Sequence, residues 1–502
     1  MSPVLVVLPV LVPLFAGVIL LLASERVVWL QRGVNLASCV ALLVIALALV
    51  ARAAGDAVGV HALGDWHAPF GIVLVADRMS ALMLLLVAVL ALVVTFTMHR
   101  GADYDGRHFH SLFQFQLLGL NGAFLTGDLF NLFVFFEILL IASYALLVFG
   151  GGRRRLAAGI HYVVLNLTGS LVFLIAVGVL YGLAGTLNMA DLSLQLAGLS
   201  AEDRPLANAA LLLLLLVFAL KAAVLPVGFW LPAAYAAAPA PVAALFAVLT
   251  KVGVYAILRV HGLMMPEDPG AGARILWWAA LLTLVLGLAG ALAASRLRAM
   301  LAWLVLVSTG TLLAGIALAT EEALAASLYY LVHSTWVTAA LFLVAGAILA
   351  RRGRWSDDAR TGPRLQAPVL AVLFFAGAVA LAGLPPLSGF VGKLLLLQAA
   401  EGAGMLFFWA LLLVSGLVSL VVFARSGSAF FWRGETRHPP VETAAPLWPA
   451  ALLLAVALVP VVAAEPVMNY MDATAQQLRA PSEYIETVLQ TYLHEQGEEA
   501  AP

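Results

Sequence analysis

Long apolar stretches alternate with short polar loops along almost the whole length of this 502-residue chain. A helix needs roughly 20 mostly apolar residues to cross a bilayer, and this spacing predicts fourteen membrane-spanning helices. They are expected at about 3–23, 33–53, 72–98, 109–125, 129–150, 157–184, 206–235, 239–260, 274–294, 299–319, 323–349, 367–399, 404–432 and 445–465. We therefore expect an all-α polytopic membrane protein without a soluble domain, and a polar tail from Pro466 that lies along the surface.

The expected seventh and twelfth spans are longer than a bilayer requires, and both are interrupted by proline. The seventh contains Pro226 and Pro232, and the twelfth contains Pro385, Pro386 and Gly389. Because proline removes a backbone amide and clashes with the preceding turn, both helices are expected to break near mid-membrane. One broken span in each half of the chain predicts an inverted-repeat transporter with its site at the breaks. The alternative is that these prolines only kink packed helices.

Composition agrees with a membrane protein and excludes several other classes. Hydrophobic residues make up 64% of the chain and charged residues only 11%, which is far from a soluble globule. The net charge of −1 gives no reason to expect a nucleic-acid partner. Cys39 is the lone cysteine, so the chain cannot hold an iron–sulfur cluster or an internal disulfide. We expect no cofactor and no metal site, and any redox chemistry would belong to a partner.

The three lysines of the chain, Lys221, Lys251 and Lys393, all lie inside apolar stretches, whereas every other cationic residue is an arginine. Lysine can lose its proton when it is desolvated or close to another cation, but arginine stays charged. Lys221 precedes Pro226 by five residues and Lys393 follows Pro386 by seven, so each lies near an expected break. An ionisable residue at membrane depth is a functional-site hypothesis.

Glu137 provides a possible counter-charge in the expected fifth span. It lies about two and a half turns after Asp128 and has apolar neighbours on both sides, which places it deep in the membrane. Such a carboxylate takes up a proton unless a cation faces it. The alternative is a structural pair with an arginine of another helix. Asp128 itself is expected to cap the helix near the outer surface.

His333 lies mid-way along the expected eleventh span, beside Ser334 and Thr335. Histidine passes a proton most easily near neutral pH, so His333 is a candidate for proton transfer. The alternative is a histidine that bonds a neighbouring backbone group. A second histidine near the start of the sixth span, His161, could serve at a proton entrance or simply cap a helix end.

Two further polar positions are weaker candidates. Tyr255 follows Lys251 by one helical turn on the same face, where its hydroxyl could anchor a water molecule. Asp77 and Arg78 open the third span, and we expect them to pair with each other or with a neighbour.

In order along the spans, the deep candidates are Glu137, Lys221, Lys251, His333 and Lys393. A charge buried alone costs several kcal/mol, so we expect a hydrated file in which each group biases the next. Glu137 facing Lys221 would favour the protonated lysine. If that pairing loosens, the proton can move along the file, which would couple the movement of one ion to that of another.

The arginines of the loops indicate an orientation. Most of them fall in odd-numbered loops, as in the run Arg153, Arg154 and Arg155 and the pair Arg351 and Arg352. By the positive-inside rule these loops are cytoplasmic, so both termini are expected on the outer side.

Four segments carry a resemblance to a known family: LTGDLFNLFVFFEILLIASYALLVFGG, HYVVLNLTGSLVFLIAVGVLYGLAGTLNMADL, FALKAAVLPVGFWLPAAYAAAPAPVAALFAVLTKVGVYAILR and LAGLPPLSGFVGKLLLLQA. They closely resemble the D subunit of the Mrp (also Mnh or Pha) multisubunit monovalent cation/proton antiporters, which are homologous to antiporter-like subunits of respiratory complex I. The resemblance covers about residues 70–430. The key positions of that family fall on Glu137, Lys221, Lys251, His333 and Lys393.

The resemblance implies an architecture of fourteen helices with two inverted five-helix repeats and discontinuous seventh and twelfth helices. On this chain it predicts an N-terminal three-helix segment at 1–105, a first repeat of helices 4–8 at 106–260 and a second repeat of helices 9–13 at 270–433. The last helix and the short polar tail occupy 440–502.

The resemblance also implies a function: a proton-translocating subunit of a bacterial cell-membrane antiporter, coupled to efflux of Na⁺, K⁺ or Li⁺. Such a subunit is a secondary transporter and not an enzyme, and it works with other subunits in a complex of six or seven different proteins. The main alternative is a proton-pumping subunit of a redox complex, either complex I or a membrane hydrogenase. Lys393 argues against complex I, whose subunit of closest length usually has glutamate there. A membrane scaffold without transport has no use for five deep ionisable groups.

Overall fold

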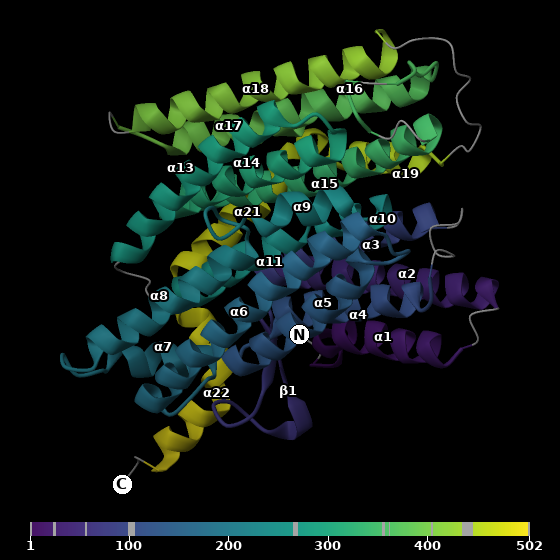
Figure 1. Cartoon of the computed structure of the whole chain (residues 1–502). Coiled ribbons are helices and arrows are strands. Elements are labelled where there is room, and N and C mark those ends of the chain that lie inside the picture. Colours follow the sequence, from purple (N-terminus) through teal and green to yellow (C-terminus); the bar gives the residue numbers. More distant parts are fainter. Residues whose placement is uncertain are drawn as a thin grey trace.

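The computed structural model describes residues 3–23, 27–55, 58–98, 106–264, 270–353, 357–360, 362–402, 405–433 and 445–499, and it is mostly helical. Most of the long helices lie side by side in one bundle (Figure 1). In that view α16 and α18 lie at one edge of the bundle, and α1 and α2 lie at the opposite edge. The termini of most long helices therefore gather at two opposite ends, as in a polytopic membrane protein.

The elements before the first broken span are α1 (Pro3–Leu22), α2 (Val28–Ala53), β1 (Gly59–Ala62), the 3₁₀ turn η1 (Leu63–Asp65), β2 (Val73–Ala76), α3 (Arg78–Met98), α4 (Phe109–Leu125), α5 (Leu129–Leu147), α6 (Arg153–Ala184) and α7 (Met189–Ala197). The central elements are α8 (Arg204–Lys221), α9 (Trp230–Ala237), α10 (Ala240–Phe246), α11 (Leu249–Ala256), the π-helical turn η3 (Ile257–His261), α12 (Gly262–Met264), α13 (Gly270–Ala293), α14 (Leu297–Ala317) and α15 (Glu321–Arg352). The last elements are α16 (Pro368–Ala382), α17 (Ser388–Ala399), α18 (Leu406–Phe431), α19 (Trp448–Val456), α20 (Val459–Val462), α21 (Ala464–Arg479) and α22 (Ser482–Glu499).

The described residues contain eleven helical segments that are long and apolar enough to cross a membrane, or twelve if one bent pair forms a single span. Helix α4 has 17 residues, α16 has 15 and α17 has 12, so each is shorter than the 18 residues expected of a full span. The prediction of a mostly helical, multi-pass membrane protein is confirmed. The count of fourteen spans, the two inverted repeats and the boundaries of the four regions stay predictions.

The expected start of the third span, at about residue 72, is corrected by the structure. Residues 73–76 form β2, which pairs antiparallel with β1 so that Gly59 lies opposite Ala76, and α3 begins at Arg78. All four residues of β2 are buried, and two of them are β-branched valines, which suit a pleated strand. Apolar character alone did not distinguish this buried strand from the first turn of a helix.

Both breaks predicted from proline are present. Helix α8 ends at Lys221 and α9 begins at Trp230, while α16 ends at Ala382 and α17 begins at Ser388. The prolines therefore do more than kink a continuous helix. Each break leaves backbone groups without a helical partner, and in a membrane these groups need partners from the protein.

Side chains supply those partners at the first break. The indole Nε1 of Trp230 donates a hydrogen bond to the carbonyl of Leu220 over 3.0 Å. The amide of Leu225 donates to the hydroxyl of Thr283 over 2.9 Å. The break is thus stabilised by polar groups of the surrounding protein, so it forms a defined structural feature of the membrane interior.

The C-terminal segment packs more closely than a surface tail would. The chain bends by 80° between residues 448–462 and α21. Helix α21 then packs against α15 and α3, and α22 packs against α7. In Figure 1 both helices, drawn in yellow, run across the direction of the bundle. Met471, Thr474 and Ala475 are buried in this contact, so the predicted surface segment packs against the bundle by one face.

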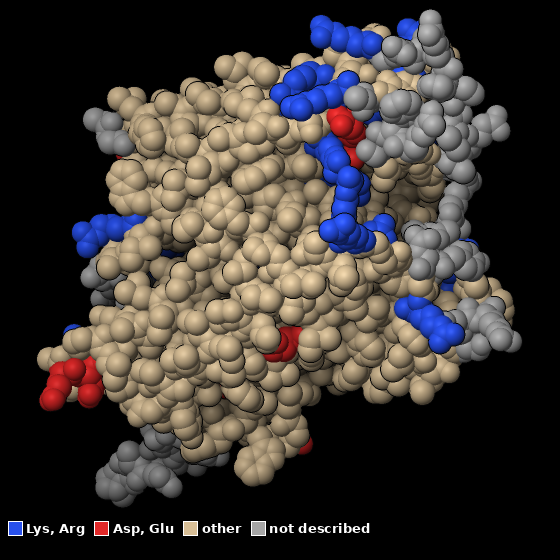
Figure 2. Space-filling model, viewed as in Figure 1, with Lys and Arg blue, Asp and Glu red and all other residues tan. Residues whose placement is uncertain are grey.

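Basic side chains are unevenly placed along the bundle. On the face drawn in Figure 2, most of the visible lysine and arginine side chains lie towards one end of the helices, at the right of the view. This clustering agrees with arginine-rich loops on one side of a membrane. The assignment of that side to the cytoplasm stays a prediction.

Candidate functional site

Glu137 and Lys221 meet through a hydroxyl group between helices α5, α6 and α8. Ser170 on α6 donates a hydrogen bond from its Oγ to Oε1 of Glu137. The ammonium of Lys221 donates to the same Oγ over 3.5 Å. Among the described residues no direct ion pair joins Glu137 to Lys221. The serine therefore stands between the expected carboxylate and the expected cation.

Lys221 is only 7% exposed and lies at the last turn of α8, where the first break begins. Its Nζ also donates to the carbonyl of Asn166 over 3.5 Å and lies 6.0 Å from the centre of the Phe136 ring. A cavity of about 20 Å³ lies against Lys221 and reaches Leu249 and Val252, which belong to α11, the helix of Lys251. A cavity needs about 10–15 Å³ to hold a water molecule, so this space suits one hydrating water.

Glu137 is less enclosed than the sequence predicted. It lies near the middle of the 19-residue helix α5, but its side chain is only half-buried. Phe130, Val134 and Ile141 on the same helix are exposed, and they follow the spacing of one helical face that includes Glu137. The carboxylate therefore lies near the middle of α5 and at the edge of this chain.

Lys251 is 1% exposed within α11. Its Nζ donates to Oγ1 of Thr250 over 3.3 Å and to Oγ of Ser308, on α14, over 3.4 Å. Tyr255, which was expected to anchor a water beside this lysine, instead donates its hydroxyl to the carbonyl of Phe124 over 2.7 Å. Two hydroxyl groups therefore accept from this ammonium, and no carboxylate among the described residues forms an ion pair with it.

His333 is 1% exposed in the middle of α15 and contacts the start of α17. Its Nδ1 lies 2.8 Å from Oγ of Ser388, the first residue of α17. This bond is to a side chain, which disfavours the alternative of a histidine held by a neighbouring backbone group. A Cβ at Gly389 would lie 2.7 Å from Nε2 of His333 and 2.0 Å from the carbonyl of Ala380, so only glycine allows this approach.

Lys393 lies in α17, and its ammonium bonds a backbone carbonyl at the second break. Its Nζ donates over 2.9 Å to the carbonyl of Ala382, the last residue of α16, and over 3.2 Å to Oγ of Ser415 on α18. The ammonium thus satisfies a carbonyl that the break leaves without a helical partner. The lysine near each break is buried against backbone carbonyl and hydroxyl oxygens.

Four of the five candidates, Lys221, Lys251, His333 and Lys393, are buried in the bundle, and Glu137 lies at its edge. In the part of the chain that the structure describes, no hydrogen bond or ion pair joins any two of them directly. Hydroxyl groups occupy the first contact positions around each one. The residues that do this, and that sequence reasoning missed, are Ser170, Thr250, Ser308, Ser388 and Ser415. Each lies inside an expected membrane span, and a hydroxyl group within a mostly apolar span was the available signal.

One of the weaker expectations is decided by the structure, and a second stays a prediction. Asp128 caps α5, because its Oδ1 accepts a hydrogen bond from the amide of Asn131 over 2.7 Å. The prediction of a capping role is confirmed. His161 is exposed on α6, and neither a proton entrance nor a capping role is shown by its contacts.

Asp77 pairs with a neighbour, as expected, and the partner is Arg259 in the π-helical turn η3. Their side chains form two contacts of 2.7 and 2.8 Å, and both are buried. The same guanidinium lies 4.9 Å from the ring centre of Tyr484 in α22. Sequence analysis missed this cluster because its members are far apart along the chain.

An open cavity of about 600 Å³ lies beside α17, beyond the turn that carries Lys393. Three carboxylate side chains, those of Glu322, Glu401 and Asp472, contribute to its lining. Gln398 of α17 lines it as well. The end of α17 therefore borders a hollow with an excess of negative charge.

No group of three or more histidine, cysteine, aspartate or glutamate side chains is arranged to hold a metal ion within the described ranges. The site consists of titratable side chains, hydroxyl groups and backbone carbonyls. This chemistry suits the binding and transfer of protons.

Comparison with known proteins identifies the family. Residues 126–419 match the family model described as NADH:quinone oxidoreductase/Mrp antiporter, transmembrane. The chain belongs to this family. The matched residues include all five candidates and both helix breaks, so the family region and the candidate site coincide.

Relatives of known name extend the likeness to nearly the full length. The chain is 41% identical to the D subunit of a probable K⁺/H⁺ antiporter of Rhizobium meliloti, over 97% of each chain. It is 38% identical to the D subunit of the Na⁺/H⁺ antiporter of Bacillus subtilis, over 96% of this chain and 99% of that protein. A chain in the structure of the Mrp complex from a Dietzia species superposes with a TM-score of 0.87 at 30% identity, over 97% of this chain and all of that one.

Proposed function

We propose that this protein is the D subunit of an Mrp-type cation/proton antiporter and that it carries protons along the buried groups of α5, α8, α11, α15 and α17. The named relatives are D subunits of antiporters and match along nearly their whole length, which favours this function over a proton-pumping subunit of a redox complex. It works with other subunits of such a complex, as the Dietzia assembly indicates.

The bridge from Glu137 through Ser170 to Lys221 is the observation that carries the proposal. A serine hydroxyl can accept a proton from one side and donate one to the other. Lys221 lies where α8 ends, so a small movement at the break changes its distance from Ser170. Loosening this contact removes the stabilisation of the protonated lysine and lets the proton leave towards the cavity beside Leu249.

The second half of the path runs through Lys251, His333 and Lys393. Hydroxyl groups beside Lys251 and His333 can hold waters or pass protons between them. At its far end, Lys393 lies on the helix whose terminus borders the acidic cavity. Negative charge near such an opening concentrates cations, including hydronium, and speeds their arrival. Inward proton flow along this path drives outward movement of Na⁺, K⁺ or Li⁺ in the complex.

The decisive experiment is cation-dependent proton movement in membrane vesicles that contain the intact complex. Glu137→Ala and Lys221→Ala are expected to abolish it while the complex still assembles. The matched controls are Glu202→Ala and Arg204→Ala, which change exposed residues at the start of α8 and in the turn before it and should leave transport unchanged. Normal antiport in both deep variants would refute the proposal.

A further inference from the structure

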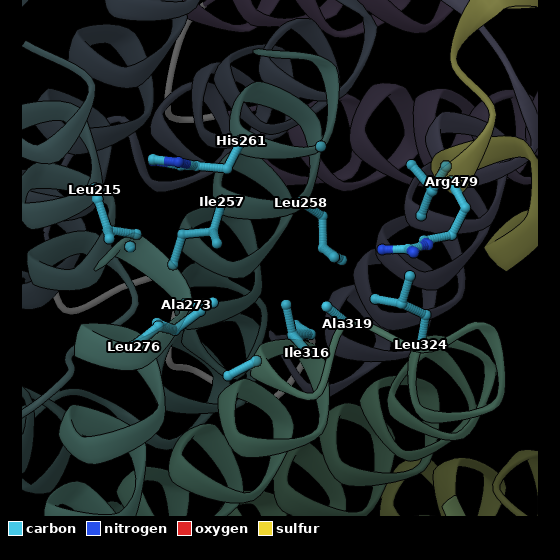
Figure 3. Close-up of a pocket in the computed structure, with 14 residues that line it drawn as sticks. Leu215, Ile257, Leu258, His261, Ala273, Leu276, Ile316, Ala319, Leu324 and Arg479 are labelled. Atoms are coloured by element: carbon cyan, nitrogen blue, oxygen red, sulfur yellow. The ribbon is translucent and has the colours of Figure 1, made fainter. Parts of the chain in front are cut away.

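A second cavity lies at the junction between the two halves of the chain, away from the titratable path. Its volume is about 110 Å³, and its walls come from α8, η3, α13, α14, α15 and α21 (Figure 3). The walls are apolar, with Leu215, Ile257, Leu276, Ile316 and Leu324 among the lining residues. An apolar hollow of this kind suits hydrocarbon.

Two basic groups at the rim, Nε2 of His261 and the guanidinium of Arg479, have no hydrogen-bond partner among the described residues. Nε2 of His261 is buried without a hydrogen-bond partner. The exposed side chain of Arg479, at the end of α21, makes no hydrogen bond or ion pair with any described residue. Figure 3 shows its guanidinium directed towards Leu258 and Leu324 at one rim, with His261 at another part of the rim. An anion near this rim would find positive charge and a donor.

The depth of the cavity agrees with a lipid. His261 lies three residues before the end of the apolar segment Ala240–Met264, which is a candidate membrane span. The rim therefore lies near the level where a bilayer changes from acyl chains to headgroups. A guanidinium at that level can hydrogen-bond the phosphate of a lipid headgroup.

We propose that this cavity binds the first methylenes of one acyl chain of an anionic phospholipid from the surrounding membrane, with the phosphate beside the guanidinium of Arg479. The part of that chain nearest the glycerol contacts the apolar walls, and the rest of it and the second acyl chain remain in the bilayer. Because the walls come from helices of both halves and from α21, a bound lipid holds these elements together at one end of the bundle.

The test measures lipid bound to the purified intact complex by native mass spectrometry. The complex is delipidated and then offered phosphatidylglycerol or phosphatidylcholine of the same acyl composition. Wild-type complex should retain one phosphatidylglycerol per copy of this chain at this site, with roughly fivefold preference over phosphatidylcholine, as expected for one arginine near the lipid phosphate. Ala273→Phe places a ring in the cavity and should remove the bound lipid.

Arg479→Gln should remove the fivefold preference, and Arg479→Lys should keep it. The control is Arg274→Gln, which changes an exposed arginine of α13 that does not line the cavity. Size-exclusion chromatography confirms assembly of each variant. Equal retention of phosphatidylglycerol in wild type, Ala273→Phe and Arg479→Gln would overturn the proposal. Equal loss in Arg274→Gln would also overturn it.

Discussion

Ser170→Ala is the sharpest test of the bridge between Glu137 and Lys221. The change removes one oxygen atom, which donates to the carboxylate and accepts from the ammonium over 3.5 Å. The same hydroxyl also bonds the carbonyl of Asn166, one turn earlier on α6, over 3.1 Å. That carbonyl already has the amide of a helix as its partner, so the loss falls mainly on the two charged groups.

The magnitude follows from the geometry. Hydrogen bonds to charged groups contribute about 1.5–3 kcal/mol, and each 1.36 kcal/mol corresponds to tenfold in rate. Glu137 is half-buried, so water or a neighbouring subunit can replace part of the lost bond. We therefore expect the lower end of the range, a loss of about tenfold in the initial rate of antiport.

The assay is fluorescence-monitored proton movement in vesicles that contain the intact complex, normalised to the amount of this subunit. Ser170→Thr keeps the hydroxyl and should retain most of the rate. Thr168→Ala is the matched control, because Thr168 is an exposed hydroxyl residue on the same helix that bonds only the carbonyl of Val164. If Ser170→Ala transports at the wild-type rate, or if Thr168→Ala loses as much, the serine is not a link in the path.

Three further predictions concern other parts of the structure. Gly389→Ala should abolish antiport, because its Cβ would lie 2.0 Å from a backbone oxygen and 2.7 Å from His333, whereas Gly178→Ala meets nothing within 4 Å and should be silent in the same vesicle assay. Asp77→Asn should lower the free energy of unfolding by about 3–5 kcal/mol in a titration with SDS, because it leaves the buried guanidinium of Arg259 without a counter-charge. The double variant Asp77→Asn with Arg259→Gln should lose less stability than Asp77→Asn alone. A double variant that loses more stability than the sum of the two single variants would contradict this account. Tyr484→Ala should expose the chain to limited proteolysis near residue 481, because it removes the ring that contacts Arg259. Tyr484→Phe keeps the ring and should stay protected. Equal protection of both variants would show that this ring does not hold α22 in place.

The phenol of Tyr484 also shows why the C-terminal helix could not be placed from sequence. Burial raises the pKa of this phenol, so it stays neutral and presents its ring to Arg259. The segment 464–499 is less apolar than the membrane spans, and its sequence pattern does not indicate which surface of the bundle it contacts. Its position depends on Arg259 and on the surfaces of α3, α7 and α15, which only the folded chain brings together.

The β1–β2 hairpin illustrates the limit of hydrophobic pattern. Val73 and Leu74 read equally well as the start of a span or as a buried strand, because both environments are apolar. Their strand conformation is decided by pairing with 59–62 and by a bridge from Leu74 to Thr126. Long-range backbone pairing of this kind leaves no local signal in the sequence.

The sequence by itself determined the membrane class, the two helix breaks and the four buried cationic or imidazole side chains of the candidate set, for a physical reason. Charged groups and proline are costly in hydrocarbon, so their presence at Lys221, Lys393 and Pro226 is visible against an apolar background. The tertiary structure alone decided which groups meet. It placed Ser170 between a carboxylate and a lysine, and it left Glu137 at the edge of the chain. It also joined Asp77 to Arg259 across 182 residues, because contacts between helices depend on packing and not on order along the chain.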